Sequence, residues 1–134
     1  MNKKRHLNAP GKLKTLYDYE EDILTFKVRD RNYKQSIEFQ NFVVDIDEED
    51  FVTGVRVFDA SKVFGVEKYL LKNVVEAKFN ATIENGVITI VLKFVGKLRN
   101  KIIPIFGEKQ QFTQQITTPA GQYHLEDSTV ECVA

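Results

Sequence analysis

The chain has 134 residues, of which 43% are hydrophobic and 28% charged, so it suits one globular domain and is too hydrophobic to be wholly disordered. Its net charge is zero, and it contains no run of about 18 apolar residues, which excludes a membrane-spanning helix. The single cysteine, Cys132, excludes an internal disulfide and predicts an intracellular, cytoplasmic protein.

Charge is distributed unevenly along the chain. Residues 1–15 carry a net charge of +5, residues 16–50 carry −7, and residues 51–134 carry +2. We expect the first segment to be a flexible basic arm, because short lysine-rich termini are usually solvated and poorly ordered. The rest of the chain is predicted to be a single globular domain, 16–134, with the subdomains 16–73 and 74–134.

Residues 23–57 alternate between apolar and polar side chains, a period of two that predicts β-strands. We expect four antiparallel strands in chain order, with two-residue turns at 31–32 and 40–41 and a four-residue loop at 47–50. The predicted cross-strand pairs include Val28–Gln35, Phe26–Ile37, Leu24–Phe39, Phe39–Phe42, Ile37–Val44, Gln35–Ile46, Ile46–Phe51 and Phe42–Val55. These pairs keep one face apolar across all four strands, and a one-residue slip would turn that face outward.

Five carboxylates stand among the six residues 45–50 and raise the question of a metal or catalytic site. A calcium-binding loop places glycine at its sixth position and glutamate at its twelfth, where this chain has Asp50 and Arg56. Acid–base catalysis needs a desolvated carboxyl group, whereas a hairpin tip is solvated. In the predicted register Asp47 lies on the outer face, opposite Lys34. The sequence therefore predicts a charged turn.

After the fourth strand, helical spacing replaces the alternation over residues 59–73. Asp59 or Ser61 is the expected N-cap, and Asn73 is the expected stop in the left-handed region. Gly65 in the interior disfavours one long helix by about 1 kcal/mol relative to alanine, so we expect the helix to be short or broken.

The second half begins with the hairpin 74–95, built on Asn85-Gly86, the preferred type I′ turn pair. Its register predicts the pairs Ile83–Ile88, Ala81–Ile90, Phe79–Leu92, Ala77–Phe94 and Lys78–Lys93. The remaining extended segments are expected at 101–106, 110–118, 122–125 and 128–133, with a turn at 118–121. The fold class is mainly β (α+β): an antiparallel four-stranded meander plus one short helix, packed on a second antiparallel β-hairpin sheet.

Four short motifs in the first half identify a family resemblance. They are Tyr17-Asp18-x-Glu20-x-Asp22-x-Leu24, Val44-Asp45-x-Asp47, Gly54-Val55 and Asp59-Ala60-Ser61-Lys62. Together they resemble the small bacterial and archaeal family called domain of unknown function 2283. The resemblance covers residues 17–64, leaves a C-terminal extension, and implies a short meander followed by a helix. Arg56 stands where the family pattern usually has glutamate.

The family has no established activity, so the resemblance implies no active site, metal or cofactor. Members sometimes sit beside genes resembling small ribonuclease toxins, which implies an antitoxin-like binding role for relatives. In this chain the acidic segment 17–22 is expected to form a turn that caps the edge of the sheet.

A basic strip is the strongest candidate for a binding site. Lys78 is expected directly opposite Lys93 on the outer face, and like charges there are unfavourable unless an anion is nearby. Residues 93–109 carry a net charge of +4, and with the N-terminal arm they could contact the phosphates of a nucleic acid. The candidate contacts are Lys78, Lys93, Lys97, Arg99 and Lys101. A solvated lysine face is the structural alternative.

The leading hypothesis is a non-enzymatic protein that binds another protein or itself, with pairing of edge strands in a homodimer as one route. Binding of nucleic acid through the basic strip is the second hypothesis. An enzyme using His124, Asp127 or Cys132 is the third, although a cysteine this close to the chain end is a poor catalytic thiol. No catalytic, metal or cofactor residue is assigned from the sequence.

Overall fold

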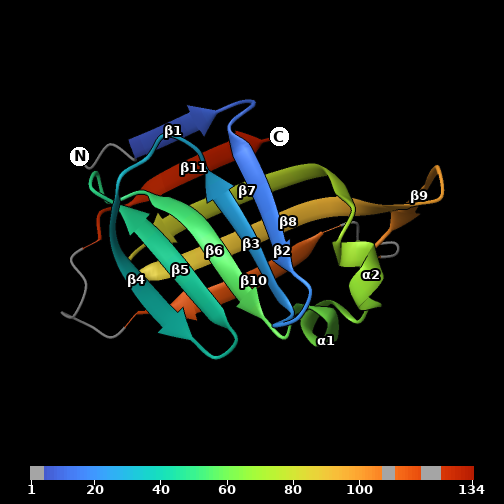
Figure 1. The fold of residues 1–134 in the computed structure, drawn as a ribbon. Coiled ribbons are helices and arrows are strands. Elements are labelled where there is room, and N and C mark those ends of the chain that lie inside the picture. Colours follow the sequence, from blue (N-terminus) through green and yellow to red (C-terminus); the bar gives the residue numbers. More distant parts are fainter. Residues whose placement is uncertain (1–4, 107–110, 119–124) are drawn as a thin grey trace.

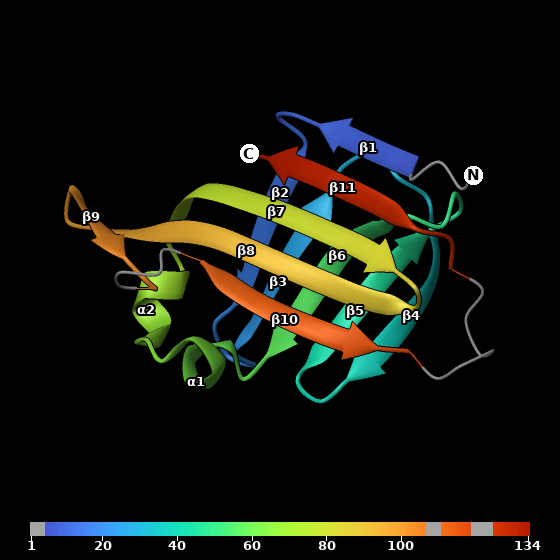
Figure 2. The same cartoon turned by 180° about the vertical axis from the view of Figure 1, so that it is seen from behind.

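Two β-sheets packed face to face build the protein in a computed structural model, which describes residues 5–106, 111–118 and 125–134 (Figures 1 and 2). The five-stranded sheet has the order β2 (Leu13–Asp18), β3 (Ile23–Val28), β6 (Val52–Phe58), β5 (Phe42–Asp47) and β4 (Tyr33–Phe39). The six-stranded sheet has the order β1 (Arg5–Ala9), β11 (Ser128–Val133), β7 (Val74–Glu84), β8 (Val87–Leu98) and β10 (Phe112–Thr117), and β9 (Lys101–Pro104) also pairs with β8. The prediction of a mainly β protein with two packed sheets is confirmed.

Two hairpins have the register that alternation predicts. In the β4–β5 hairpin Phe39 lies opposite Phe42 and Ile37 opposite Val44. In the β7–β8 hairpin Ile83 lies opposite Ile88, and the predicted pairs continue to Lys78 and Lys93. Beyond that point the register shifts, because a bulge interrupts β7 before the predicted pairing of Ala77 with Phe94.

The predicted order of the meander is wrong, because β3 does not pair with β4. Its neighbours are β2 and β6, and β4 forms the edge of the sheet. The connection 29–32 therefore crosses over β6 and β5, a Greek-key order. From Val28 to Tyr33 the chain advances five residues, and at about 3.3 Å per residue it can span three strand spacings of about 4.8 Å. Alternation is satisfied by either order, because each strand shows the same apolar face to any neighbour.

The pairing of β5 with β6 also differs from the prediction. Phe42 lies opposite Val57 rather than Val55, and Ile46 lies opposite Val52 rather than Phe51, after a bulge at Asp45/Ile46. Residues 47–51 now separate this pair, one residue more than predicted, and hydrogen bonds of the Asp47 side chain and main chain close the loop. The apolar set survives this shift, since every residue of the predicted face is buried except Phe39, which is half-buried.

Residues 5–15 do not form the flexible basic arm that their charge predicts. Residues 5–9 form β1, which pairs in parallel with β11, and Leu13 begins β2, which pairs with β3. The alternation of Leu13, Thr15 and Tyr17 with Lys14 and Leu16 marks β2 in the sequence, although the lysines suggested a solvated tail. Residues 1–4 lie outside the described part of the chain.

The helical segment breaks at Gly65, as its glycine suggested. α1 spans Ala60–Phe64 and ends at Gly65, whose φ of 68° is left-handed, and α2 spans Lys68–Leu71. Neither helix is long and apolar enough to cross a membrane, a finding that covers the described residues. The expected stop at Asn73 is wrong, because Asn73 has no positive φ and α2 ends at Leu71.

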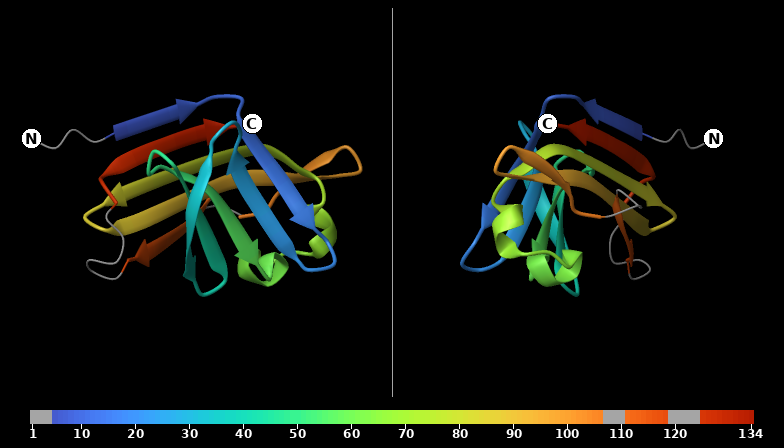
Figure 3. Two further views of the ribbon diagram at one scale, coloured as in Figure 1. Left: turned by 60° about the vertical axis from the view of Figure 1, so that its left-hand side comes forward. Right: turned by 90° about the vertical axis from the view of Figure 1, so that its right-hand side faces the viewer.

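The core fills the space between the sheets, with α1 and α2 at one end of the sandwich (Figure 3). Phe64 of α1 makes edge contacts with three other rings, with centroid distances of 5.1–5.6 Å to Phe94, Phe106 and Phe112. Such edge-to-face pairs add about 0.5–1.5 kcal/mol each beyond the burial of area. The aromatic cluster thus closes the end at which β8 passes from β10 to β9.

Candidate functional site

The lysine pair of the β7–β8 hairpin lies where the sequence predicts it. The Asn85-Gly86 turn sets Lys78 opposite Lys93, and both side chains are exposed on the outer face of the six-stranded sheet. Directly opposed residues have Cβ atoms about 4.5–5.5 Å apart, so the two ammonium groups repel each other. No carboxylate forms an ion pair with either lysine among the described side chains.

A pocket opens beside Lys93. Along β8 the pairing with β10 ends at Leu92, and the pairing with β9 begins at Val95. In this interval a cavity of about 300 Å³ lies over the buried side chain of Phe94. The other described residues that line it are Glu76, Lys93, Val95, Pro104, Ile105 and Phe106. Five of these described lining residues, counting Phe94, are apolar, whereas Lys93 carries an amine and Glu76 a carboxylate.

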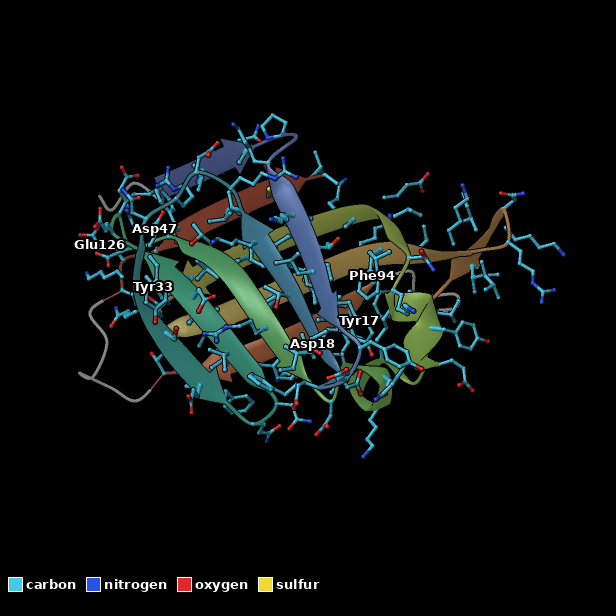
Figure 4. The ribbon with its side chains drawn as sticks, viewed as in Figure 1. Tyr17, Asp18, Tyr33, Asp47, Phe94 and Glu126 are labelled. Atoms are coloured by element: carbon cyan, nitrogen blue, oxygen red, sulfur yellow. The ribbon has the colours of Figure 1, made fainter. Side chains whose placement is uncertain are left out.

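The rest of the basic strip lies on the β8–β9 hairpin. Lys97, Arg99 and Lys101 are exposed, and Arg99 and Asn100 form the turn with positive φ. The hairpin projects from the same end of the sandwich as the helices, beyond Phe94 (Figure 4). Lys109, the last basic residue of the predicted strip, lies outside the described residues.

The N-terminal segment does not extend this strip. Arg5 lies in one row with Ser128, Ile83 and Ile88, at the Asn85-Gly86 end of the sheet. Its guanidinium group donates to main-chain oxygens of Glu49 and Asp50. Because β8 rises about 3.4 Å per residue, roughly 35 Å of strand separates Ile88 in this row from the β8–β9 turn. The prediction that the N-terminal arm and the basic strip form one phosphate-binding surface is therefore wrong for the arm from residue 5 onward.

The acidic turn 45–50 contains a buried carboxylate that stabilises the β5–β6 loop. The carboxylate of Asp47 is 1% exposed, where the sequence predicts an outer face, and it lies opposite Tyr33 rather than Lys34. It accepts hydrogen bonds from Nε of Arg31 at 2.7 Å and from the N–H groups of Glu49 and Phe51. Burial lowers the pKa of Arg31, but the carboxylates of Glu49 and Asp47 outweigh it and raise the pKa overall. The role of Asp47 is thus structural, because its buried carboxylate binds main-chain N–H groups of the loop and the side chain of Arg31.

A second buried carboxylate joins the first helix to the β2–β3 turn. Asp22 accepts hydrogen bonds from the hydroxyl groups of Tyr17 and Ser61, both at 2.6 Å, and from the N–H of Ser61 at 3.0 Å. Burial raises the pKa of Asp22, but the hydrogen bonds from Ser61 and Tyr17 outweigh it and leave the pKa below its ordinary value. Burial and the adjacent carboxylate of Asp22 raise the pKa of Tyr17.

This network corrects the predicted helix cap. Asp59 makes no side-chain cap, and Asp22 instead accepts from the free N–H of Ser61, 39 residues later, at the start of α1. The sequence carried a signal for this role only in the family motif that contains Tyr17 and Asp22.

The proposed thiol site is not assembled in the described residues. Cys132 is buried in β11, and burial raises the pKa of its thiol, which disfavours the thiolate. Asp127 accepts a hydrogen bond from the N–H of Asn85 at the hairpin tip, and His124 lies outside the described residues. Within the described part of the chain, no three His, Cys, Asp or Glu side chains are grouped to hold a metal ion.

The edges of the two sheets differ in how they are protected. Natural edge strands usually carry charges, proline or a bulge, which prevent pairing with other chains. β4 has Lys34, Glu38 and a bulge, and β1, β2 and β9 each contain charged or basic residues. Of the described edge strands only β10, with the sequence FTQQIT, has no charge, no proline and no register shift. Thr113, Gln115 and Thr117 are exposed along it.

Comparison with known proteins places the first half of the chain in a family. Residues 14–61 match the family model described as protein of unknown function (DUF2283). An uncharacterised protein of Methanocaldococcus jannaschii is 34% identical over 93 residues, which cover 69% of this chain and 80% of that protein. A Methanosarcina mazei protein named "putative hypoxanthine phosphoribosyltransferase" is 32% identical over 89 residues, or 65% of this chain and 71% of its own length.

No solved structure matches the chain significantly. The matched segment contains both Tyr17 and Asp22 and ends at Ser61, so the Asp22 network lies inside the family segment. The remaining residues, with the six-stranded sheet and the basic hairpin, lie outside it. The chain belongs to the family of proteins of unknown function DUF2283, through residues 14–61.

Proposed function

We propose that the protein is a non-enzymatic, cytoplasmic module that binds protein, either a partner or a second copy of itself, by adding a strand to the edge of β10. The observation that carries this proposal is the uncharged, unbulged edge of β10 beside four edges that carry charges or a basic residue. An added antiparallel strand of six residues would form about six main-chain hydrogen bonds with this edge.

The neighbours of β10 suit such an addition. Phe112 stacks on Phe42 of the other sheet at a ring-centroid distance of 5.8 Å, and Ile116 is buried, so the strand is held firmly by its inner side chains. The outer residues Thr113 and Gln115 are short or neutral and would oppose no charge on an incoming strand. A rigid, neutral edge binds a strand with little loss of conformational freedom.

The test is a charge placed on the edge. The double variant Thr113→Lys, Gln115→Lys should abolish self-association in native mass spectrometry or recovery of a partner from the cells of origin. Thr89→Lys is the matched control, because Thr89 is the cross-strand neighbour of Gln115 on the same outer face but lies in a central strand. A wild-type chain that stays monomeric and recovers no partner would refute the proposal, as would equal loss in both variants.

Nucleic-acid binding is the second candidate, favoured by the three exposed basic residues of the β8–β9 hairpin. Phosphate contacts would make the affinity fall steeply with salt, with a slope of about −0.7 per contact for a single strand. Arg99→Glu combined with Lys101→Glu should then remove binding of a single-stranded oligonucleotide, and unchanged affinity would exclude this candidate.

An enzymatic role is suggested only by the name of the M. mazei relative. Transfer of a phosphoribosyl group requires a site for phosphate groups, which proteins commonly bind with a glycine-rich loop at the start of a helix. The described helices have five and four residues and follow Asp59 and Glu67. This geometry gives no reason to extend that relative's name to this chain.

A further inference from the structure

We propose that the pocket beside Lys93 binds a small, free organic carboxylate with an apolar body. This site is separate from the edge of β10 and would exist whether or not the protein binds a partner there. Three independent features of the β7–β8 hairpin meet at the pocket: an opposed pair of lysines, an unusual backbone conformation and an unfilled apolar cavity.

The first feature is the charge. Lys93 lines the pocket, and Lys78 stands directly opposite it across the hairpin. A carboxylate placed beside Lys93 would convert a repulsive pair into two attractive contacts, since each ammonium group can donate to a carboxylate oxygen. Glu76 also lines the pocket and balances the charge of Lys93, so the excess positive charge comes from Lys78 across the hairpin.

The second feature is the backbone of Glu76. Its φ is 52°, and it is the only described residue within a strand, rather than a turn, that has a positive φ. Glycine is the usual residue at this position of a β-bulge, and strained positions of other residues cluster at ligand sites. The bulge shifts the register between Val75 and Lys78 and so opens the hairpin where the pocket begins.

The third feature is the cavity itself. Its volume of about 300 Å³ lies at the lower end of ligand pockets and has room for roughly ten atoms the size of a water molecule. Among its lining residues Phe94 and Ile105 are buried, and Val95 and Phe106 are half-buried. A mostly apolar lining that includes a lysine selects an amphiphilic anion over inorganic phosphate or a sugar-phosphate chain, which would leave the apolar side chains uncovered.

Octanoate, with ten non-hydrogen atoms, is the probe for this site. Titration followed by amide resonances should shift Lys93, Phe94 and Val95, with a Kd on the order of 0.1–1 mM for so small a ligand. Octanamide, which keeps the shape without the charge, should bind about tenfold more weakly. Lys93→Met should weaken octanoate binding by about tenfold and remove the difference between the two probes.

Lys97→Met is the matched control, because Lys97 is exposed on the same strand but does not line the pocket. This variant should bind octanoate within twofold of the wild type. The proposal is overturned if octanoate and octanamide bind equally to the wild type, or if the two lysine variants lose affinity equally. It is also overturned if the shifts map away from the pocket or octanoate does not bind.

Discussion

Replacement of Asp22 by asparagine tests whether the family motif stabilises the fold by connecting the β2–β3 turn to α1. The carboxylate accepts three hydrogen bonds, from the hydroxyl of Tyr17 and from the hydroxyl and N–H of Ser61, while only 6% exposed. Asparagine keeps the shape but removes the charge and presents an N–H₂ group where a donor already points. At least one buried donor would then lose its partner.

The expected loss of unfolding free energy is about 3 kcal/mol. Hydrogen bonds to a charged group contribute about 1.5–3 kcal/mol each, and their effects on one carboxylate do not add fully. With a urea dependence of about 2 kcal/mol per molar, the midpoint of unfolding should fall by about 1.5 M. Chemical unfolding followed by circular dichroism measures this shift. Asp18→Asn, in the same turn but exposed, should change the free energy by less than about 0.5 kcal/mol.

The pH dependence supplies a second readout. Because the pKa of Asp22 in the folded state lies below its ordinary value of 3.8, its contribution is complete above that value and is lost as the pH falls through the folded pKa. The difference between wild type and Asp22→Asn should therefore be constant from pH 7 to about pH 5 and shrink below about pH 4. The stabilising role of Asp22 would be refuted if the variant lost less than about 0.5 kcal/mol of unfolding free energy at pH 7. It would also be refuted if the difference between the two proteins grew on acidification.

Three further predictions follow from single contacts. Asp47→Ala should lower the unfolding free energy by about 3 kcal/mol in urea titrations, because it leaves the partly buried guanidinium group of Arg31 with Glu49 alone and removes the acceptor that closes the β5–β6 loop. Gly86→Ala should cost about 1–2 kcal/mol in the same assay, because its φ of 79° is left-handed. Lys78→Glu should stabilise the chain by about 0.5 kcal/mol at low salt by pairing with Lys93, and the gain should vanish in 1 M salt.

Each of these results has a control on the same element. Glu48→Ala changes an exposed carboxylate of the β5–β6 loop and should shift the free energy by less than about 0.5 kcal/mol. Asn85→Gly should be tolerated at φ 50°, in contrast to Gly86→Ala beside it. A Lys78→Gln variant that matches Lys78→Glu at every salt concentration would show that the lysine pair carries no electrostatic cost.

Local chemistry in the sequence was enough to predict the hairpins. Asn85-Gly86 favours a type I′ turn, and the turn then determines every pair from Ile83–Ile88 to Lys78–Lys93. The break of the helical segment at Gly65 has the same local origin, since a residue without Cβ adopts the left-handed conformation at no steric cost. The apolar face of the first sheet was predicted for the same reason, because its period depends only on neighbouring residues.

The tertiary structure alone decided which strands are neighbours and where buried charges lie. Alternation cannot distinguish a β3–β4 pair from a β3–β6 pair, since both bury the same face. The roles of Asp22 and Asp47 depend on contacts between residues 16 to 39 positions apart. The pocket at Lys93 depends on a bulge that has no local sequence signal. Sequence patterns report the preferences of adjacent residues, whereas these features arise only when distant segments share one low-dielectric interior.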